Sequence, residues 1–327
     1  MPAVSVKNLT KQFHELCAVN NISFDINQGE VFGLLGPNGA GKTTTISMLS
    51  TMLKPTSGTA TINGYDIIKD PDNVRKSIGI VFQDPSLDED LTAYENLDLH
   101  GRLYGVPKNV RKQKIIELLK LVELDNRKDD LVKTFSGGMK RRLEIARGLL
   151  HDPKVLFLDE PTIGLDPQTR NHLWTYIEKL SKEKNITIIL TTHYMDEADR
   201  LCGRVAIIDH GKIIALNTPS YLKNEIGGDV IVIRASNIEK LYSLLKQPWI
   251  KNVTKHDELI YIHLKDAEKH VVDIVNLANK NNIEIKSLSI NKPSLEDVFL
   301  HFTGKTIREQ EASAIDNIRI RRRARNK

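Results

Sequence analysis

The chain has 327 residues, 40% hydrophobic and 27% charged, which is the composition of a globular protein long enough for a main domain and a smaller one. It contains no run of about 20 apolar residues, which excludes a bilayer-spanning helix within this sequence, and residues 1–5 do not begin a signal peptide. The net charge is +5, and the six basic residues of 319–327 contribute +6 by themselves. Residues 1–318 therefore carry a net charge of −1, which does not favour a polyanionic partner.

Two early segments, residues 4–9 and 22–27, alternate apolar and polar side chains and predict half-exposed antiparallel strands. The apolar run at 31–35 predicts a buried parallel strand. Residues 44–53 then predict a helix, and residues 59–64, which end in Asn-Gly, predict a second hairpin.

Between that buried strand and the first helix, the sequence Gly-Pro-Asn-Gly-Ala-Gly-Lys-Thr fits the phosphate-binding pattern of Gly, four residues, Gly-Lys-Thr. Glycines let backbone N–H groups close around phosphate oxygens, and the helix N-terminus adds positive partial charge. Lys42 is predicted to bridge the β and γ phosphates of ATP, and the Thr43 hydroxyl to bind Mg²⁺. The alternative is a glycine-rich turn without a ligand. The predicted nucleotide-binding residues of this segment are Gly36, Pro37, Asn38, Gly39, Ala40, Gly41, Lys42, Thr43 and Thr44.

A helical insert is predicted further along the chain. Residues 78–82 predict a strand that ends at Gln83. Residues 92–123 carry apolar side chains at helical spacing, with a break at 105–107. These patterns predict a helical insert, at about 84–150, within an α/β core.

The sequence Ser-Gly-Gly precedes the helix predicted at 139–150. Ser136 has the character of an N-cap, and Gly137 and Gly138 leave backbone N–H groups bare, which predicts a second anion site. The three basic residues at 140–142 oppose the helix dipole, and we expect a bound anion to relieve this. The alternative is a capped helix with a basic surface that contacts acidic groups of a neighbour.

The buried run 155–158 is followed directly by Asp159 and Glu160, at the edge where open α/β sheets bind ligands. Adjacent residues of an extended chain point in opposite directions. The two acids can therefore take separate roles. Asp159 is predicted to hold the Mg²⁺ hydration shell, and Glu160 to orient or deprotonate the attacking water. Solvated acids at a strand end are the alternative.

The strand predicted at 187–191 is followed by His193, which is expected to bond the γ phosphate and hold the water and Glu160 in line. A structural histidine is the alternative. Gln83 also follows a predicted strand directly, so it is expected to reach the same edge of the sheet and to contact Mg²⁺ or the water. The alternation of strands and helices predicts a parallel sheet covered on both faces.

The pattern changes near residue 217, and residues 229–291 predict the order βαββαβ of a small α+β ferredoxin-like domain, closed by a helix at 294–302. This domain either binds a small ligand and regulates the ATPase, or acts as a scaffold or dimerisation module. No cluster of polar residues in its sequence favours the ligand-binding role. Residues 306–327 predict a charged, weakly structured tail that is either solvated or docked to anionic lipid headgroups.

One phosphate loop and one second anion site, about a hundred residues apart, serve the same γ phosphate only when two chains pair head to tail around ATP. In this, and in the order of its motifs, the sequence resembles the ATP-binding subunits of ABC transporters. The resemblance covers residues 3–220 and implies a P-loop NTPase core of ABC type with an antiparallel β subdomain and a helical subdomain. An accessory domain at 228–304 and the tail at 305–327 follow.

The family's motifs follow in chain order along this sequence. By this resemblance the motifs are the Walker A loop at 36–43, the Q-loop at Gln83, the signature motif at 136–138, Walker B at 155–159 with Glu160 as catalytic glutamate, the D-loop at 164–166 and the switch histidine at His193. The resemblance implies catalysis by Lys42, Glu160 and His193, and metal binding by Thr43, Gln83 and Asp159. It also implies nucleotide contacts by Ser136, Gly137, Gly138 and Asp166, and by Phe13 stacked on adenine. Met139 stands where the family often has Gln, and Phe13 where Tyr is frequent.

Residues 292–299, Lys-Pro-Ser-Leu-Glu-Asp-Val-Phe, resemble the daunorubicin-resistance type of drug-export ATPase. This implies a homodimer at the cytoplasmic face of the membrane that exports a drug-like or hydrophobic compound. The compound would pass through a separately encoded integral membrane permease, which this chain would contact through the surface near Gln83 and residues 91–104. The sequence does not name the transported compound.

The rival is an ABC ATPase that acts on nucleic acid or ribosomes. The basic tail favours it. The single ATPase core, the lack of long heptads and zinc-type cysteines, and the charge of −1 on residues 1–318 disfavour it. We therefore expect no nucleic acid partner.

Overall fold

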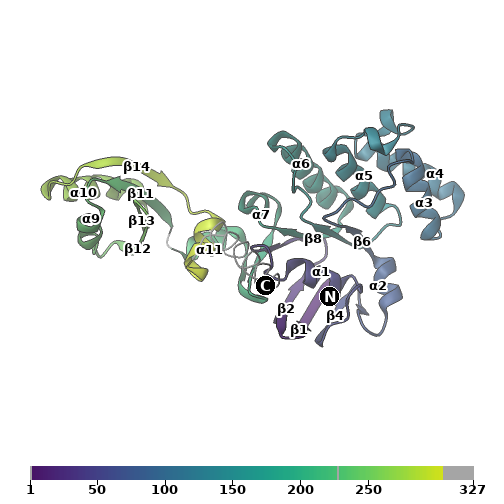
Figure 1. Cartoon of the computed structure of the whole chain (residues 1–327), viewed down its shortest axis with the longest axis horizontal. Coiled ribbons are helices and arrows are strands. Elements are labelled where there is room, and N and C mark those ends of the chain that lie inside the picture. Colours follow the sequence, from purple (N-terminus) through teal and green to yellow (C-terminus); the bar gives the residue numbers. More distant parts are fainter. Residues whose placement is uncertain (1, 227, 305–327) are drawn as a thin grey trace, which may run out of the picture. The chain divides into compact units, whose positions relative to one another are not determined.

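A computed structural model of the chain describes residues 2–226 and 228–304, which form two compact units (Figure 1). The larger unit runs to Leu216 and the smaller begins at Asn217. The tail predicted at 305–327 lies outside the described residues. Within the described ranges, no helix combines the length and the apolar character that a membrane crossing requires.

The larger unit is built on a six-stranded sheet in which β9, β3, β8, β7 and β6 run parallel. In spatial order, the strands are β10 (Lys212–Asn217), β9 (Arg204–Asp209), β3 (Val31–Leu35), β8 (Thr187–Thr192), β7 (Val155–Asp159) and β6 (Ile78–Val81). Every residue of β3, β7 and β8 is buried, as in sheets covered on both faces. The predicted parallel sheet is confirmed, and its carboxyl ends meet at one edge.

A second, antiparallel sheet packs its apolar face on the core that β3 also contributes to. Its strands, in spatial order, are β2 (Leu16–Ile26), β1 (Val4–Phe13), β4 (Ser57–Ile62) and β5 (Tyr65–Asp66). The first two strands are longer than the predicted 4–9 and 22–27. Asn8 and Asn21 have positive φ, and the register of the pair shifts in this region, so the alternation breaks while the pairing continues to the turn at 14–15.

Seven α-helices are described in the larger unit. They are α1 (Lys42–Leu49), α2 (Pro71–Ser77), α3 (Ala93–Leu103), α4 (Lys108–Leu121), α5 (Gly137–Leu149), α6 (Pro167–Lys184) and α7 (Met195–Leu201). Short 3-10 helices at 125–127 and 132–134 join α4 to α5. Helices α3, α4 and α5 form the predicted insert, and Gly105, with φ +69°, marks the predicted break. Helix α5 begins two residues before the predicted 139, because the Ser136 side chain caps it.

The smaller unit has the predicted βαββαβ order. The elements are α8 (Pro219–Glu225), β11 (Asp229–Ala235), α9 (Ile238–Leu244), β12 (Ile250–His256), β13 (Leu259–Leu264), α10 (Ala267–Lys280), β14 (Ile285–Asn291) and α11 (Leu295–Thr303). The sheet order is β12-β13-β11-β14, with each pair antiparallel. Its core contains Ile231, Ile262 and Ile274. The likeness to ferredoxin-like domains stays a prediction.

Candidate active site

The phosphate loop joins β3 to α1. Gly41 has φ +106°, and a Cβ at this position would lie 2.4 Å from the carbonyl oxygen of Ala18, so the backbone path requires glycine. Helix α1 begins directly after it without a capping side chain. Its first N–H groups therefore have no side-chain acceptor, and such groups suit a phosphate.

Lys42 is buried beneath this loop, with 4% of its surface exposed. Its Nζ donates to the carbonyl oxygens of Gly36 at 2.8 Å and Pro37 at 3.1 Å. The same Nζ lies 3.1 Å from Glu160 Oε1. The loop lysine and the acid after β7 are therefore in direct contact, although 118 positions of the sequence separate them.

Asp159, the last residue of β7, lies beside the phosphate loop. Its Oδ1 accepts a hydrogen bond from the hydroxyl of Thr43 at 3.3 Å and from that of Thr191 at 2.5 Å. Hydroxyl and carboxylate oxygens are suitable ligands for Mg²⁺, which keeps several waters and needs few protein groups. Among the described residues, no group of three or more His, Cys, Asp or Glu side chains could hold a metal ion, and the Thr43 and Asp159 oxygens lie together beside the phosphate loop.

Glu160 adopts φ +47°, which is uncommon for a residue with a side chain. Its N–H is held by the Thr191 hydroxyl at 2.9 Å, and its Oε2 lies 2.7 Å from His193 Nδ1. Burial acts to raise the pKa of the Glu160 carboxyl, but the hydrogen bond with His193 and the charge of Lys42 outweigh it and lower that pKa. The carboxylate is therefore ionised at neutral pH.

The start of α5 is exposed at Ser136 and Gly137. The Ser136 hydroxyl oxygen accepts a hydrogen bond from the N–H of Met139 at 3.3 Å. Gly138 is buried against Thr169, whose Cγ2 would lie 2.3 Å from an added Cβ. The segment is thus a capped helix N-terminus, and its second glycine is required by packing against α6.

The basic residues at 140–142, whose charge we expect a bound anion to relieve, each have an acceptor within the chain, and the anion site at 136–138 stays a prediction. Lys140 Nζ pairs with Glu89 at 2.5 Å, and Arg142 donates to the carbonyl of Val122 at 2.8 Å. Arg141 is buried and pairs with Glu144 at 3.0 Å. Because each charge already has an acceptor within the chain, the unfavourable dipole interaction does not require a ligand.

Three other predicted residues have no hydrogen bond or ion pair, among the described residues, with the acid cluster, which comprises Lys42, Thr43, Asp159, Glu160 and His193. Gln83 is exposed, and no hydrogen bond in the described ranges joins its side chain to Thr43 or Asp159. Asp166 caps α6, accepting from the N–H groups of Gln168 and Thr169 at 3.0 Å each. Phe13 is 42% exposed beside the hairpin turn, with Lys11 Nζ 5.0 Å from its ring centre. Phe13 is therefore not a core residue.

The sequence analysis missed Glu197 altogether, and it missed the burial of Arg141, which it placed among the basic residues of the first turn of α5. Glu197, fully buried on α7, accepts hydrogen bonds at 2.8 Å from Thr162 Oγ1 and Trp174 Nε1, and burial raises its pKa. Arg141 contacts the backbone around Glu160. The available signal was the opposite charges of Arg141 and Glu144 three residues apart on α5, a spacing that allows a buried pair.

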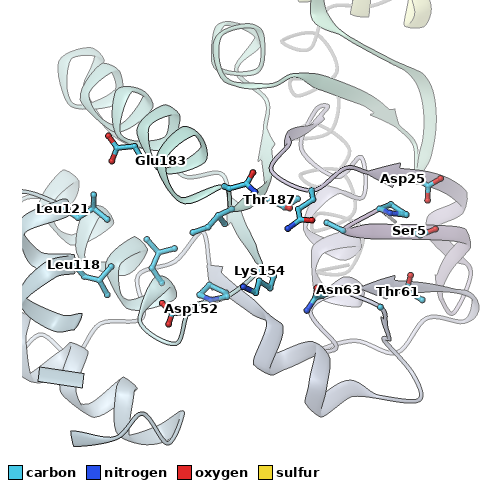
Figure 2. Close-up of a pocket in the computed structure, with 18 of the residues that line it drawn as sticks. Ser5, Asp25, Thr61, Asn63, Leu118, Leu121, Asp152, Lys154, Glu183 and Thr187 are labelled. Atoms are coloured by element: carbon cyan, nitrogen blue, oxygen red, sulfur yellow. The ribbon is translucent and has the colours of Figure 1, made fainter. Parts of the chain in front are cut away.

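A pocket of about 1320 Å³ lies at the other edge of the parallel sheet (Figure 2). Lys154 directly precedes β7 and Thr187 begins β8, so this pocket lies at the amino ends of the strands. Thr61 and Leu118 line opposite sides of it (Figure 2). No residue of the phosphate loop or of the acid cluster lines this pocket, which is separate from the candidate active site.

Two family models match the chain. The ABC transporter model matches residues 19–163, which include the phosphate loop and Glu160. The model of the C-terminal domain of DrrA1-3-like ATP-binding proteins matches residues 218–303.

Similar proteins span nearly the whole chain. The linearmycin resistance ATP-binding protein LnrL of Bacillus subtilis is 41% identical over 311 residues, covering 94% of this chain and 100% of that protein. The daunorubicin/doxorubicin resistance ATP-binding protein DrrA of Streptomyces peucetius is 39% identical over 309 residues, covering 92% of each.

Solved structures match the larger part of the fold. CbiO1 from Clostridium perfringens, part of the ABC transporter complex cbiONQ, has a TM-score of 0.64 and 32% identity over 68% of this chain and 91% of that one. The ATP-binding cassette MJ0796, in a dimeric post-hydrolysis state bound to ADP and Pi, has a TM-score of 0.59 and 30% identity over 66% of this chain and 98% of that one. This chain belongs to the ATP-binding subunits of ABC transporters, which hydrolyse ATP to drive transport through a separate membrane subunit.

Proposed function

We propose that this protein drives the export of a drug-like or hydrophobic compound, as the ATPase of a transporter at the cytoplasmic face of the membrane. The observation that carries the catalytic part is the buried contact of Lys42 with Glu160 and of Glu160 with His193, at 3.1 and 2.7 Å. Export is supported by the relatives LnrL and DrrA, which are named for resistance to linearmycin and to daunorubicin and doxorubicin.

The nucleotide half-site follows from the groups that the loop exposes. The N–H groups of the loop and of α1 are suited to hold the phosphates of ATP, and Lys42 to neutralise their charge. Phe13 offers an exposed ring for the adenine. We assign Thr43 and Asp159 to Mg²⁺, with Gln83 as a further ligand, and Asp166 to a contact with the nucleotide. When bound, Mg²⁺ neutralises charge that develops on the phosphate oxygens.

Glu160 is the group that activates water. Its pKa is lowered, so at neutral pH it accepts a hydrogen bond from water and orients the oxygen for attack. His193, only partly buried, contacts the Glu160 carboxylate at 2.7 Å through Nδ1, and we assign its other ring nitrogen to the γ phosphate. Lys42 leaves Glu160 for the phosphate when ATP binds, which frees the carboxylate for the water.

A second copy of the chain completes the site. Ser136 and Gly137 are exposed at a helix N-terminus, where N–H groups favour an anion. In a head-to-tail homodimer, Ser136, Gly137 and Gly138 of each copy face the γ phosphate held by the other. The dimeric state of MJ0796 supports this arrangement.

The helical insert is the proposed contact with the membrane permease. Leu99, Leu103 and Tyr104 are large apolar residues at the end of α3 that are 48%, 75% and 40% exposed. These exposed apolar side chains support the assignment of this region to the permease contact. Contact of the basic tail with anionic lipid is a further proposal, and its test is loss of liposome binding on deletion of residues 316–327.

The test of the proposed function is Glu160→Gln. This variant keeps the shape of the side chain and removes the anion that activates water, so turnover falls about 100- to 10,000-fold. ATP binding persists, and gel filtration with ATP shows a dimer. Unchanged turnover would exclude Glu160 from catalysis, and a monomer under these conditions would contradict the shared site. Turnover that responds to DNA or RNA, and not to membranes that carry the permease, would contradict the transport role.

A further inference from the structure

The guanidinium of Arg141 contacts three consecutive carbonyl groups around Glu160. Arg141 lies on α5, five residues after Ser136. Its Nε donates to the carbonyl oxygen of Pro161 at 2.8 Å, and its Nη2 donates to those of Asp159 at 2.9 Å and Glu160 at 3.1 Å. A helix of the insert therefore directly holds the backbone that carries the proposed catalytic acid.

The remaining N–H groups of Arg141 reach the Q-loop segment and a buried acid. Nη1 donates to the carbonyl oxygen of Phe82, the residue before Gln83, and to Glu144 Oε2 at 3.0 Å. Glu144 in turn accepts a hydrogen bond from the N–H of Ser86 at 2.8 Å. A guanidinium has five N–H donors, so this side chain, which is 7% exposed, has an acceptor for every donor.

The backbone at Glu160 needs such support. Its φ of +47° lies in a region that residues with a side chain occupy only when the surrounding structure holds them there. Arg141 fixes the carbonyls before, at and after this φ angle, while Thr191 fixes the Glu160 N–H. The direction of the Glu160 side chain therefore depends on a residue of α5.

We propose that Arg141 is a positioning residue for ATP hydrolysis, which holds Glu160 in its productive backbone conformation and ties it to the helix that begins at Ser136. A displacement of α5, when its N-terminus engages the nucleotide of a second copy, then reaches Glu160 through one side chain. The proposal depends on the proposed function, in which Glu160 activates water. Lysine cannot replace Arg141, because its three donors on one nitrogen do not match the five acceptors.

The first experiment compares Arg141→Lys with Arg111→Lys in the full-length protein. Arg111 is the matched control, because it is also buried at 7% and binds a carbonyl, that of Val106 at 2.7 Å, and a carboxylate, that of Asp98 at 2.6 Å. We expect Arg141→Lys to lower kcat about 10- to 100-fold, with KM for ATP changed by less than about threefold. Arg111→Lys should leave both constants within about twofold of the original. Equal effects of the two variants on kcat would overturn the proposal.

The second experiment is a double-mutant cycle with Glu160→Gln, measured as single-turnover hydrolysis of radiolabelled ATP. If Arg141 acts through Glu160, the variant with both substitutions hydrolyses ATP within about twofold of the rate of Glu160→Gln alone. A further drop equal to that of Arg141→Lys in the original protein would show an independent, structural effect and overturn the proposal. Normal turnover by Glu160→Gln alone would instead refute the proposed function.

If Arg141→Lys does not fold, Glu144→Gln serves in its place. This change keeps the volume of the side chain and removes the charge that holds Nη1 of Arg141. We expect kcat to fall about 3- to 10-fold with an unchanged KM. An unchanged kcat would overturn the proposal.

Discussion

The two halves of the proposed nucleotide site are built in opposite ways. Lys42, Asp159 and Glu160 are at most 5% exposed, and each has partners within the chain. Ser136 and Gly137 are exposed at the start of α5. Buried ionised groups require partners, so the first half is assembled before a ligand arrives, whereas an exposed helix N-terminus keeps its N–H groups for an external anion. One half is complete within the chain, and the other is presented outward.

The largest effect is expected from damage to the buried half. In Lys42→Met, loss of the ammonium group that lies 3.1 Å from the Glu160 carboxylate should reduce turnover about 100- to 1,000-fold, because the phosphate charge loses its main counter-charge. Steady-state turnover and calorimetric titration with ATP check this. Lys128→Met, an exposed control on the insert, should keep full activity. Turnover within threefold of the original would contradict the role of Lys42.

His193→Ala tests the electrostatics of the same half. The His193 hydrogen bond is one cause of the lowered pKa of Glu160, so its loss raises that pKa. Hydrolysis needs the ionised carboxylate, and turnover falls as the pH drops through this pKa. The acid limb of the pH–rate profile should therefore move to higher pH, with a maximal rate about 10- to 100-fold lower. An acid limb at its original position would show that His193 does not set the state of Glu160.

The lowered pKa of Glu160 also implies a smaller effect, on the free energy of unfolding. A carboxyl whose pKa is lowered in the folded state stabilises that state above its unfolded pKa, and the stabilisation is lost as the pH falls through the folded pKa. His193→Ala should therefore reduce the free energy of unfolding at neutral pH and lose that difference in acid. Urea unfolding at pH 7 and in acid measures this. A difference that grows in acid would have the wrong sign.

The outward half is tested by Ser136→Ala with Ser294→Ala as its matched control. Both serines cap a helix by accepting the N–H three residues on, at 3.3 and 3.2 Å. Each change should cost about 1 kcal/mol of stability. In the Glu160→Gln background, Ser136→Ala alone should weaken the ATP-dependent dimer, as measured by light scattering. Equal dimerisation of the two variants would contradict the assignment of Ser136 to the outward half of the site.

The smallest effect on basal turnover is expected at the proposed permease contact. Leu103 is 75% exposed on α3, so Leu103→Ser should leave basal turnover within about twofold. Stimulation by membranes that carry the hydrophobic protein of the neighbouring reading frame should be lost. Val272→Ser, at a residue 63% exposed on α10, is the control and should retain stimulation. Loss of stimulation in both variants, or in neither, would remove the assignment.

The fold and the buried half were predictable from the sequence because their signals are local. The glycine pattern at 36–43 and the acids that end β7 each follow a buried strand, and parallel strands bring their ends to one edge. The length of the first hairpin was not predictable from the sequence, because Asn8 and Asn21 break the alternation that marks a strand. The number of residues in each helix also depended on caps such as Ser136.

The role of the basic turn of α5 could not be read from its own residues. Burial of Arg141 depends on carbonyls at 82 and 159–161, which the fold brings together from distant parts of the sequence. Local charge therefore led us to expect that a bound anion relieves this basic turn, whereas tertiary contacts within the chain supply partners for its charges. The same limit applies to Glu197, whose partners Thr162 and Trp174 come from another loop and helix.

The structure of the Glu160→Gln variant with ATP and Mg²⁺ is the most direct measurement of whether one site is divided between two copies. We predict that Ser136 of one copy lies within hydrogen-bonding distance of the γ phosphate bound at Lys42 of another. A structure in which Ser136 is remote from every triphosphate, in all neighbouring copies, would contradict it.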